Sequence, residues 1–109
     1  MKHFAYAFLV STLLAGPLAA QETDLLIGSV SASSSHYAYF VAVGQLINEN
    51  AEGLRASVVE TGGTMDNVRR MARGQVDFGT VTTNVQRHAA EGTNEFEGNA
   101  QDLTLLWVY

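Results

Sequence analysis

The chain alternates short apolar runs with amphipathic stretches, and this alternation constrains its fold more than any other feature. Three apolar runs each lead into a stretch with a helical stripe, and a fourth run follows; they span residues 24–30, 55–60, 75–81 and 103–109. The core of the first, Leu25-Leu26-Ile27, is unbroken, which predicts a strand covered on both faces. Strands that alternate with helices predict an α/β layer with a mainly parallel sheet, flanking helices and right-handed crossovers.

Helices are predicted between the apolar runs from stripes and end signals. The first helix begins after an N-cap at Ser34 or Ser35. Its apolar stripe has three- and four-residue steps and consists of Tyr37, Phe40, Val41, Gly44 and Ile47. The second helix is predicted to be capped by Thr64 and to stop at Gly74. The third follows residues 82–84 and runs to about residue 91.

The first twenty residues have the three-part pattern of a secretory signal peptide. Lys2 and His3 form a short basic start, residues 4–15 are almost entirely apolar, and Ala20 precedes a polar pair. An apolar run of this length is shorter than the roughly 20 residues needed to span a bilayer. We therefore predict a signal peptide over residues 1–20, cleavage after Ala20 and a periplasmic mature chain. An uncleaved N-terminal membrane anchor is the alternative.

Small hydroxyl and glycine residues occupy the three junctions where a predicted strand passes into a helix. Parallel strands bring such turns to one sheet edge, where open α/β sheets bind ligands. Each turn also begins a helix, whose free N–H groups and dipole favour an anion. We predict a neutral, donor-rich pocket for a carboxylate or other small anion, with ligand-binding residues Ser31, Ser33, Ser34, Thr61, Gly62, Gly63, Thr64, Thr82 and Asn84. Taken singly, each turn has a purely structural explanation, because the same residue types are standard in turns and caps.

Composition and spacing disfavour other classes of function. The chain has no cysteine, which excludes disulfides, thiolate metal sites and a cysteine nucleophile. Its net charge of −5 disfavours nucleic-acid binding. Ser35-His36 with Asp66 or Asp77 would be a nucleophile set without a G-x-S-x-G elbow, and His36 and His88 lack convincing partners at metal-ligand spacing. We predict a binding protein that is not an enzyme and uses no metal or cofactor.

Several short motifs follow one another in a fixed order: Ile27-Gly28-Ser29, Ser31–Ser35, Tyr37, Thr61-Gly62-Gly63-Thr64 with Asn67, Gly74–Asp77 and Phe96-Glu97-Gly98. This order resembles the N-terminal part of the TAXI family of solute receptors, the extracytoplasmic subunits of one branch of TRAP transporters. The first turn is serine-rich where that family usually has glycines, so ligand preference is expected to differ.

The resemblance implies a type II periplasmic binding-protein fold, in which two α/β lobes close on a small organic acid or amino acid. Glutamate-like ligands and dicarboxylates are the usual expectation, and the ligand would pass to a TRAP-type membrane permease. The resemblance also adds Tyr37 to the predicted site. Residues 21–109 would then be the N-terminal part of lobe I, an incomplete fragment of the solute-binding domain. The alternative function is a periplasmic ligand-binding sensor or adaptor for a membrane signalling protein.

Overall fold

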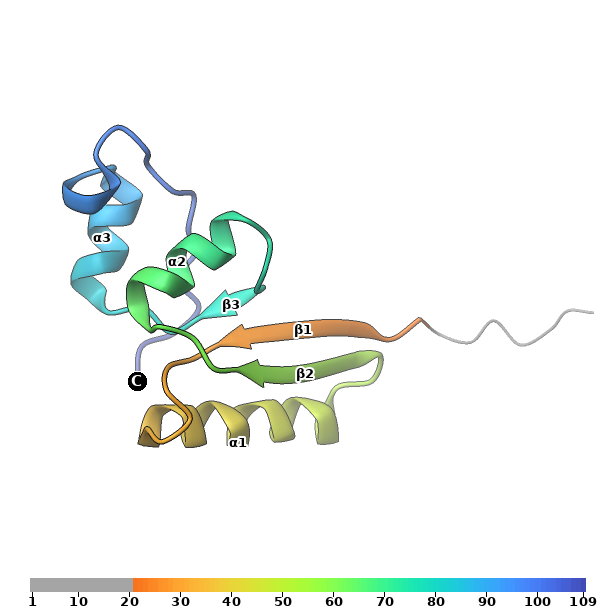
Figure 1. Ribbon diagram of the computed structural model, residues 1–109. Helices are drawn as coiled ribbons and strands as arrows, with labels where there is room; N and C mark the ends of the chain where they lie inside the picture. The colour runs from red at the N-terminus through yellow and green to blue at the C-terminus, as the bar shows by residue number, and fades with distance from the viewer. Residues whose placement is uncertain (1–20) are drawn as a thin grey trace, which may run out of the picture.

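Residues 21–109 form one open sheet of three parallel strands flanked by helices (Figure 1). They are the residues that the computed structural model describes, so the predicted signal peptide lies outside the described part. The elements, in chain order, are β1 (Thr23–Gly28), α1 (Ser35–Asn50), β2 (Leu54–Val59), α2 (Thr64–Ala72), β3 (Phe78–Gly79), α3 (Thr83–Glu91) and the 3₁₀-helix η1 (Asn94–Phe96). The predicted α/β class, parallel sheet and flanking helices are confirmed, and the fold is consistent with part of a periplasmic binding-protein lobe.

Strand β1 is the central strand of the sheet, in the order β2-β1-β3. It pairs with β2 along its whole length, from Thr23 opposite Leu54 to Gly28 opposite Val59. It pairs with β3 only at its end, where Ile27 and Gly28 lie opposite Phe78 and Gly79. Because all three strands are parallel, their carboxyl ends lie at one edge of the sheet.

Helices α1 and α2 cover opposite faces of the sheet. Successive residues of a strand point to opposite faces. On one face, the neighbours Ile27 and Phe78 pack with Phe40 of α1. On the other face, the neighbours Gly28 and Gly79 lie directly under Asn67 of α2. Figure 1 shows α1 alongside β2 and α2 above β1 and β3.

Two apolar clusters hold these layers together. The first lies between the sheet and α1 and has Ile27, Phe40 and Ala56 as its buried members. The second lies between α2, α3 and η1, where the buried members are Val68, Ala89 and Phe96. The predicted α1 stripe is confirmed, since Phe40 and Gly44 are its buried residues. The expectation that β1 is covered on both faces holds only in part, because the Leu26 side chain remains 37% exposed.

The helix ends agree with the sequence at two positions and differ at one. Ser34 is the N-cap of α1, and its Oγ accepts the N–H of His36 at 3.0 Å. Gly74 ends α2 with a φ of +67°, and its N–H donates to the carbonyl of Met71, as in a Schellman motif. The prediction that Thr64 caps α2 is wrong, because Thr64 is already helical and Gly63 is the N-cap.

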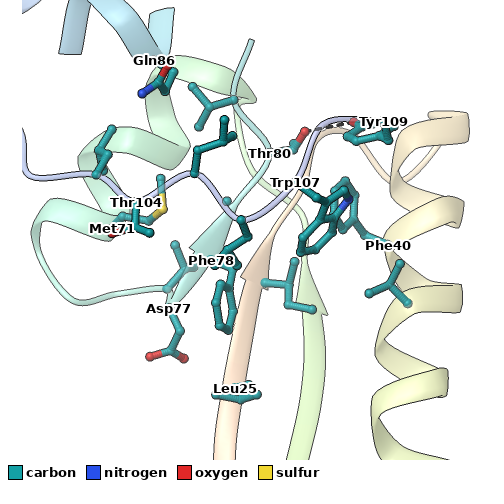
Figure 2. A pocket seen from close by; sticks show the side chains of 18 of the residues that line it. Leu25, Phe40, Met71, Asp77, Phe78, Thr80, Gln86, Thr104, Trp107 and Tyr109 are labelled. Carbon is teal, nitrogen blue, oxygen red and sulfur yellow. Dashed lines mark hydrogen bonds between the residues drawn. The ribbon is translucent and has the colours of Figure 1, made fainter. Parts of the chain in front are cut away.

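The two later apolar runs form less strand than predicted. Strand β3 is two residues long, because Asp77 Oδ2 accepts the Leu26 N–H at 2.8 Å where a continuing strand would offer a carbonyl. The predicted strand over residues 103–109 is absent from the sheet. Those residues instead run across the α1 face, where Trp107 lies beside Phe40 with ring centroids 6.3 Å apart (Figure 2). The apolar character of this run therefore serves aromatic packing rather than strand pairing.

Candidate functional site

The turns that follow β1, β2 and β3 meet at one edge of the sheet, and hydrogen bonds join them. The Ser29 N–H, just after β1, donates to the carbonyl of Val59 at the end of β2. The Thr80 N–H, just after β3, donates to the carbonyl of Gly28. Thr61, in the turn after β2, donates its hydroxyl to the carbonyl of Ser29 at 2.6 Å. The three polar turns thus form a connected edge.

The first turn presents small hydroxyls to solvent. The Oγ atoms of Ser31 and Ser33 lie 3.0 Å apart, and both residues are exposed. Ser34 is half-buried, and its side chain is already used as the cap of α1. The backbone N–H of Ala32 donates to Glu60 Oε1 at 3.0 Å. A carboxylate of the chain itself therefore occupies a backbone donor of this turn.

The second turn is the most tightly bonded of the three. Thr61 is buried, and its Oγ1 accepts the Gly63 N–H at 3.2 Å while donating to Ser29. The Gly62 N–H donates to Asp66 Oδ2 at 3.0 Å. Gly63 has a φ of +93°, a conformation in which a side chain is strained. Thr61 and Asp66 thus bond the N–H groups of Gly63 and Gly62 just before α2, and no side chain caps the first turn of the helix.

The remaining predicted residues, Thr82, Asn84 and Tyr37, take little part in the hydrogen bonds of the edge. Thr82 is the N-cap of α3 without a side-chain cap bond, and both Thr82 and Asn84 are exposed. The Tyr37 hydroxyl lies 3.5 Å from the carbonyl of Val58, at the long limit of a hydrogen bond. That contact joins α1 to β2, so Tyr37 packs beside the edge rather than projecting freely from it.

The predicted neutral character of this edge is wrong. Two carboxylates, those of Glu60 and Asp66, accept backbone N–H groups of the first and second turns. Asp66 also pairs with Arg70, whose Nε lies 2.8 Å from Oδ2. The Gly62 N–H and then the Arg70 guanidinium lower the pKa of Asp66 below its ordinary value of 3.8. Within residues 21–109 Glu60 has no ion-pair partner, so its charge faces the edge uncompensated.

The sequence patterns did not predict an aromatic side to the edge. The hydroxyl of Tyr109 lies 3.1 Å from Thr80 Oγ1, directly after β3 (Figure 2). The Tyr109 ring stacks on Tyr39 at 4.9 Å and lies edge-on to His36 at 6.0 Å. Nothing in the spacing of these residues indicated the contact, because it depends on the path of residues 103–109. Glu60 did carry a signal, since it is the polar residue between β2 and the second turn.

A separate cavity of about 560 Å³ lies between the α1 face of the sheet and residues 101–109. Figure 2 shows Leu25, Phe40, Phe78 and Trp107 around it, and its lining is mainly apolar. None of the predicted ligand-binding residues lines it. The polar groups in its lining, such as those of Thr80, Gln86 and Gln101, come from outside the predicted set of ligand-binding residues, so this cavity is not the predicted site.

The hydrolase and metal alternatives find no support in the geometry of the described residues. His36 Nδ1 contacts Ser34 Oγ at 3.5 Å rather than Ser35. Asp66 is bound to Arg70, and Asp77 accepts the Leu26 N–H, so neither orients His36. Among residues 21–109 no three histidine or carboxylate side chains gather where they could hold a metal ion.

A parallel α/β layer with polar turns gathered at the carboxyl edge is consistent with part of a periplasmic binding-protein lobe. The chain belongs to the NMT1-like family, whose sequence profile matches residues 27–109. This is a family of binding proteins rather than enzymes, typically extracytoplasmic, and membership gives the chain a substrate-binding role toward a small molecule. A comparison with curated proteins finds no match. Across residues 21–109, no helix has the length and apolar character required to cross a membrane.

Proposed function

We propose that the chain is an extracytoplasmic solute receptor of a TRAP-type transporter, in the TAXI branch. It binds a small carboxylate or amino acid and delivers it to a membrane permease. The observation that carries the proposal is the connected edge, where three polar turns meet and the Ser29 carbonyl receives the Thr61 hydroxyl. The resemblance of the motif order to TAXI receptors supports the same function.

Only some of the polar residues in the turns have groups that remain available to a ligand. Ser34 and Thr61 have their hydroxyls committed to backbone partners. Ser31, Ser33 and Thr82 are exposed at the edge. These hydroxyls, with Asn84 and the backbone at the start of α2, make up the contact surface that lobe I contributes, because the Gly62 and Gly63 N–H groups are already bonded within the turn. The proposal also includes a second lobe to close on the ligand, and a signal peptide over residues 1–20 that directs the chain to the periplasm.

The charges at the edge favour an amino acid over a dicarboxylate as ligand. A dianion would approach Glu60, which is exposed and has no cation paired with it among residues 21–109. Like charges at short range disfavour one another. An amino acid brings an ammonium group, which Glu60 can accept, and a carboxylate, which the helix-starting N–H groups can bind. The proposed ligand is therefore a zwitterionic amino acid, including a glutamate-like one.

Mass spectrometry of small molecules co-purified with the protein tests the proposal. Isothermal titration calorimetry completes the test by measuring binding of L-glutamate, L-glutamine, a neutral apolar amino acid and succinate. We expect an amino acid in the co-purified fraction and tighter binding of at least one amino acid than of succinate. Absence of a co-purified solute together with no heat of binding for the whole panel would overturn the proposed function.

A further inference from the structure

The side chain of Asn67 is buried at the centre of the connected edge. Asn67 has no solvent-exposed surface, although it is a polar residue on α2. Its Nδ2 donates to the carbonyl of Ser29 at 2.8 Å and to the carbonyl of Thr80 at 2.8 Å. One amide group thus bridges the backbone just after β1 to the backbone just after β3.

The orientation of this amide is forced by its surroundings. Both partners are carbonyl oxygens, which only accept hydrogen bonds, so the NH₂ group has to face them. Oδ1 points the other way and has no partner among the described residues. The Ser29 carbonyl also receives the Thr61 hydroxyl, so this oxygen ties the first and second turns to Asn67, and the Thr80 carbonyl ties the third.

Two glycines on adjacent strands create the space for Asn67. A Cβ at Gly28 would lie 2.6 Å from Asn67 Oδ1, and a Cβ at Gly79 would lie 2.9 Å from Asn67 Cβ. Real Cβ atoms do not approach that closely. Gly28 and Gly79 are partners in the β1–β3 ladder, so the sheet presents a floor without side chains under Asn67.

We infer that Asn67 is a positioning residue that sets the spacing of the three turns for ligand binding. The inference rests on the proposed function of the same edge and adds the group that holds it in register. Asn67 does not reach the ligand, because it is covered by its own helix and the sheet. It acts through the carbonyls of Ser29 and Thr80, whose positions determine where the first and third turns begin.

Asn48, which is exposed where Asn67 is buried, offers a control in the same chain that is matched in its hydrogen bonds. It also lies on a helix, and it also bonds a strand backbone, with Nδ2 donating to the Ala56 carbonyl at 3.0 Å and Oδ1 accepting the Ala56 N–H at 2.6 Å. Ala56 lies in the middle of β2, away from the carboxyl edge. Asn67→Ala and Asn48→Ala each remove two side-chain to backbone hydrogen bonds, but only the first removes them from the turns.

The test compares binding of L-glutamate, or of the tightest amino acid in the panel, by the two variants at a temperature where both are folded by circular dichroism. We expect Asn67→Ala to weaken binding by at least about tenfold, the lower range for loss of an outer-shell positioning group. We expect Asn48→Ala to bind as the unmodified protein does. Unchanged binding by Asn67→Ala, or equal losses in both variants, would overturn the inference.

A second measurement uses the unmodified protein, so it can be made even if Asn67→Ala fails to fold. In the unmodified protein, the Asn67 side-chain amide protons are expected to exchange slowly and to show through-hydrogen-bond coupling to the carbonyl carbons of Ser29 and Thr80. Rapid exchange with no coupling would overturn the inference. Because this readout needs no ligand, it remains decisive if the whole amino-acid panel fails to bind, which would overturn the proposed function alone.

Discussion

Asp66 joins the glycine turn to the body of α2. Its Oδ2 accepts the Gly62 N–H and contacts the guanidinium of Arg70 one helical turn later. The sequence indicated only that an acid in the first turn of a helix suits the helix dipole. The structure adds that this acid also holds the turn before the helix.

Asp66 should make the stability of the protein sensitive to acid. Its pKa is lowered in the folded state, first by the Gly62 N–H and then by Arg70. Its stabilising contribution is therefore present above the unfolded value and is lost as pH falls through the folded value. We expect the free energy of unfolding to fall, as the pH is lowered from about 5 to well below the ordinary value of 3.8, more steeply in the unmodified protein than in Asp66→Asn. Urea titrations across this range measure it.

Asp24→Asn is the control for that measurement, because Asp24 is exposed and has no ion-pair partner among residues 21–109. This variant should keep the steep fall of the unmodified protein. Parallel curves for Asp66→Asn and the unmodified protein would contradict the role given to Asp66.

Glu60→Gln should shift the ligand preference of the edge away from the amino acid and toward succinate. The change removes the uncompensated charge but keeps an oxygen that can accept the Ala32 N–H. We expect weaker binding of the preferred amino acid and stronger binding of succinate, each by about fivefold, as a partly exposed charge pair is worth about 1 kcal/mol. Titration calorimetry with both ligands measures the two shifts.

Glu52→Gln makes the same change of net charge in the turn before β2, at the opposite end of the sheet. It should leave both affinities unchanged. Equal shifts in the two variants would mean that overall charge, rather than Glu60 at the edge, sets the preference.

The turns that begin and end α2 each place a glycine at a positive φ, one inside the connected edge and one outside it. Gly63 and Gly74 have φ values of +93° and +67°, and an added Cβ meets nothing closer than 3.7 Å at either position. Only Gly63 belongs to the connected edge. Substitutions at the two glycines therefore distinguish the conformational cost of losing a glycine from the role of the glycine turn in ligand binding.

Gly74→Ala should destabilise the protein by about 1 kcal/mol or slightly more, the cost of an L-residue in the left-handed region. Gly63→Ala should cost about 1–3 kcal/mol, because a φ of +93° with a ψ of −157° lies in a region essentially restricted to glycine. We expect Gly63→Ala to lose ligand binding, because the chain must change conformation within the edge, while Gly74→Ala keeps it. Chemical denaturation and calorimetry on the two variants check both statements. Full binding by Gly63→Ala would remove the glycine turn from the site.

One aromatic residue is central to the packing on the α1 side of the sheet. Phe40 of α1 is 4% exposed and lies in the core with Ile27 of β1. It also contacts the rings of Trp107 and Tyr109, at 6.3 and 5.6 Å between centroids. Phe40 thus links the sheet, a helix and residues 103–109.

Phe40→Ala should cost about 3 kcal/mol or more of unfolding free energy, as for other buried aromatic truncations. Trp107 is the single tryptophan of the chain and is 46% exposed, so its emission is expected to shift to longer wavelength when Phe40 is lost. Leu46→Ala, on the same helix at a side chain that is 60% exposed, should change stability by less than about 0.5 kcal/mol and leave the emission unchanged. An unshifted Trp107 spectrum in Phe40→Ala would show that residues 103–109 do not rest on α1.

Local patterns predicted the elements well where neighbours in the chain determine them. The stripe of α1, its cap at Ser34 and the stop of α2 at Gly74 are interactions within a few residues, and all three are present. The run at residues 103–109 was predicted as a strand because apolar and aromatic residues favour strands. Its actual path depends on the ring of Phe40, more than sixty residues earlier in the chain.

The order of strand-like and helix-like segments was enough to establish the α/β class and to bring three polar turns to one edge, since parallel strands with crossovers allow few other arrangements. The tertiary structure alone decided the charge and the register of that edge. Glu60 reaches the Ala32 N–H across 28 positions of sequence, and Asn67 reaches Ser29 across 38. Such contacts leave no periodic signature, because they depend on where separate elements come together in space.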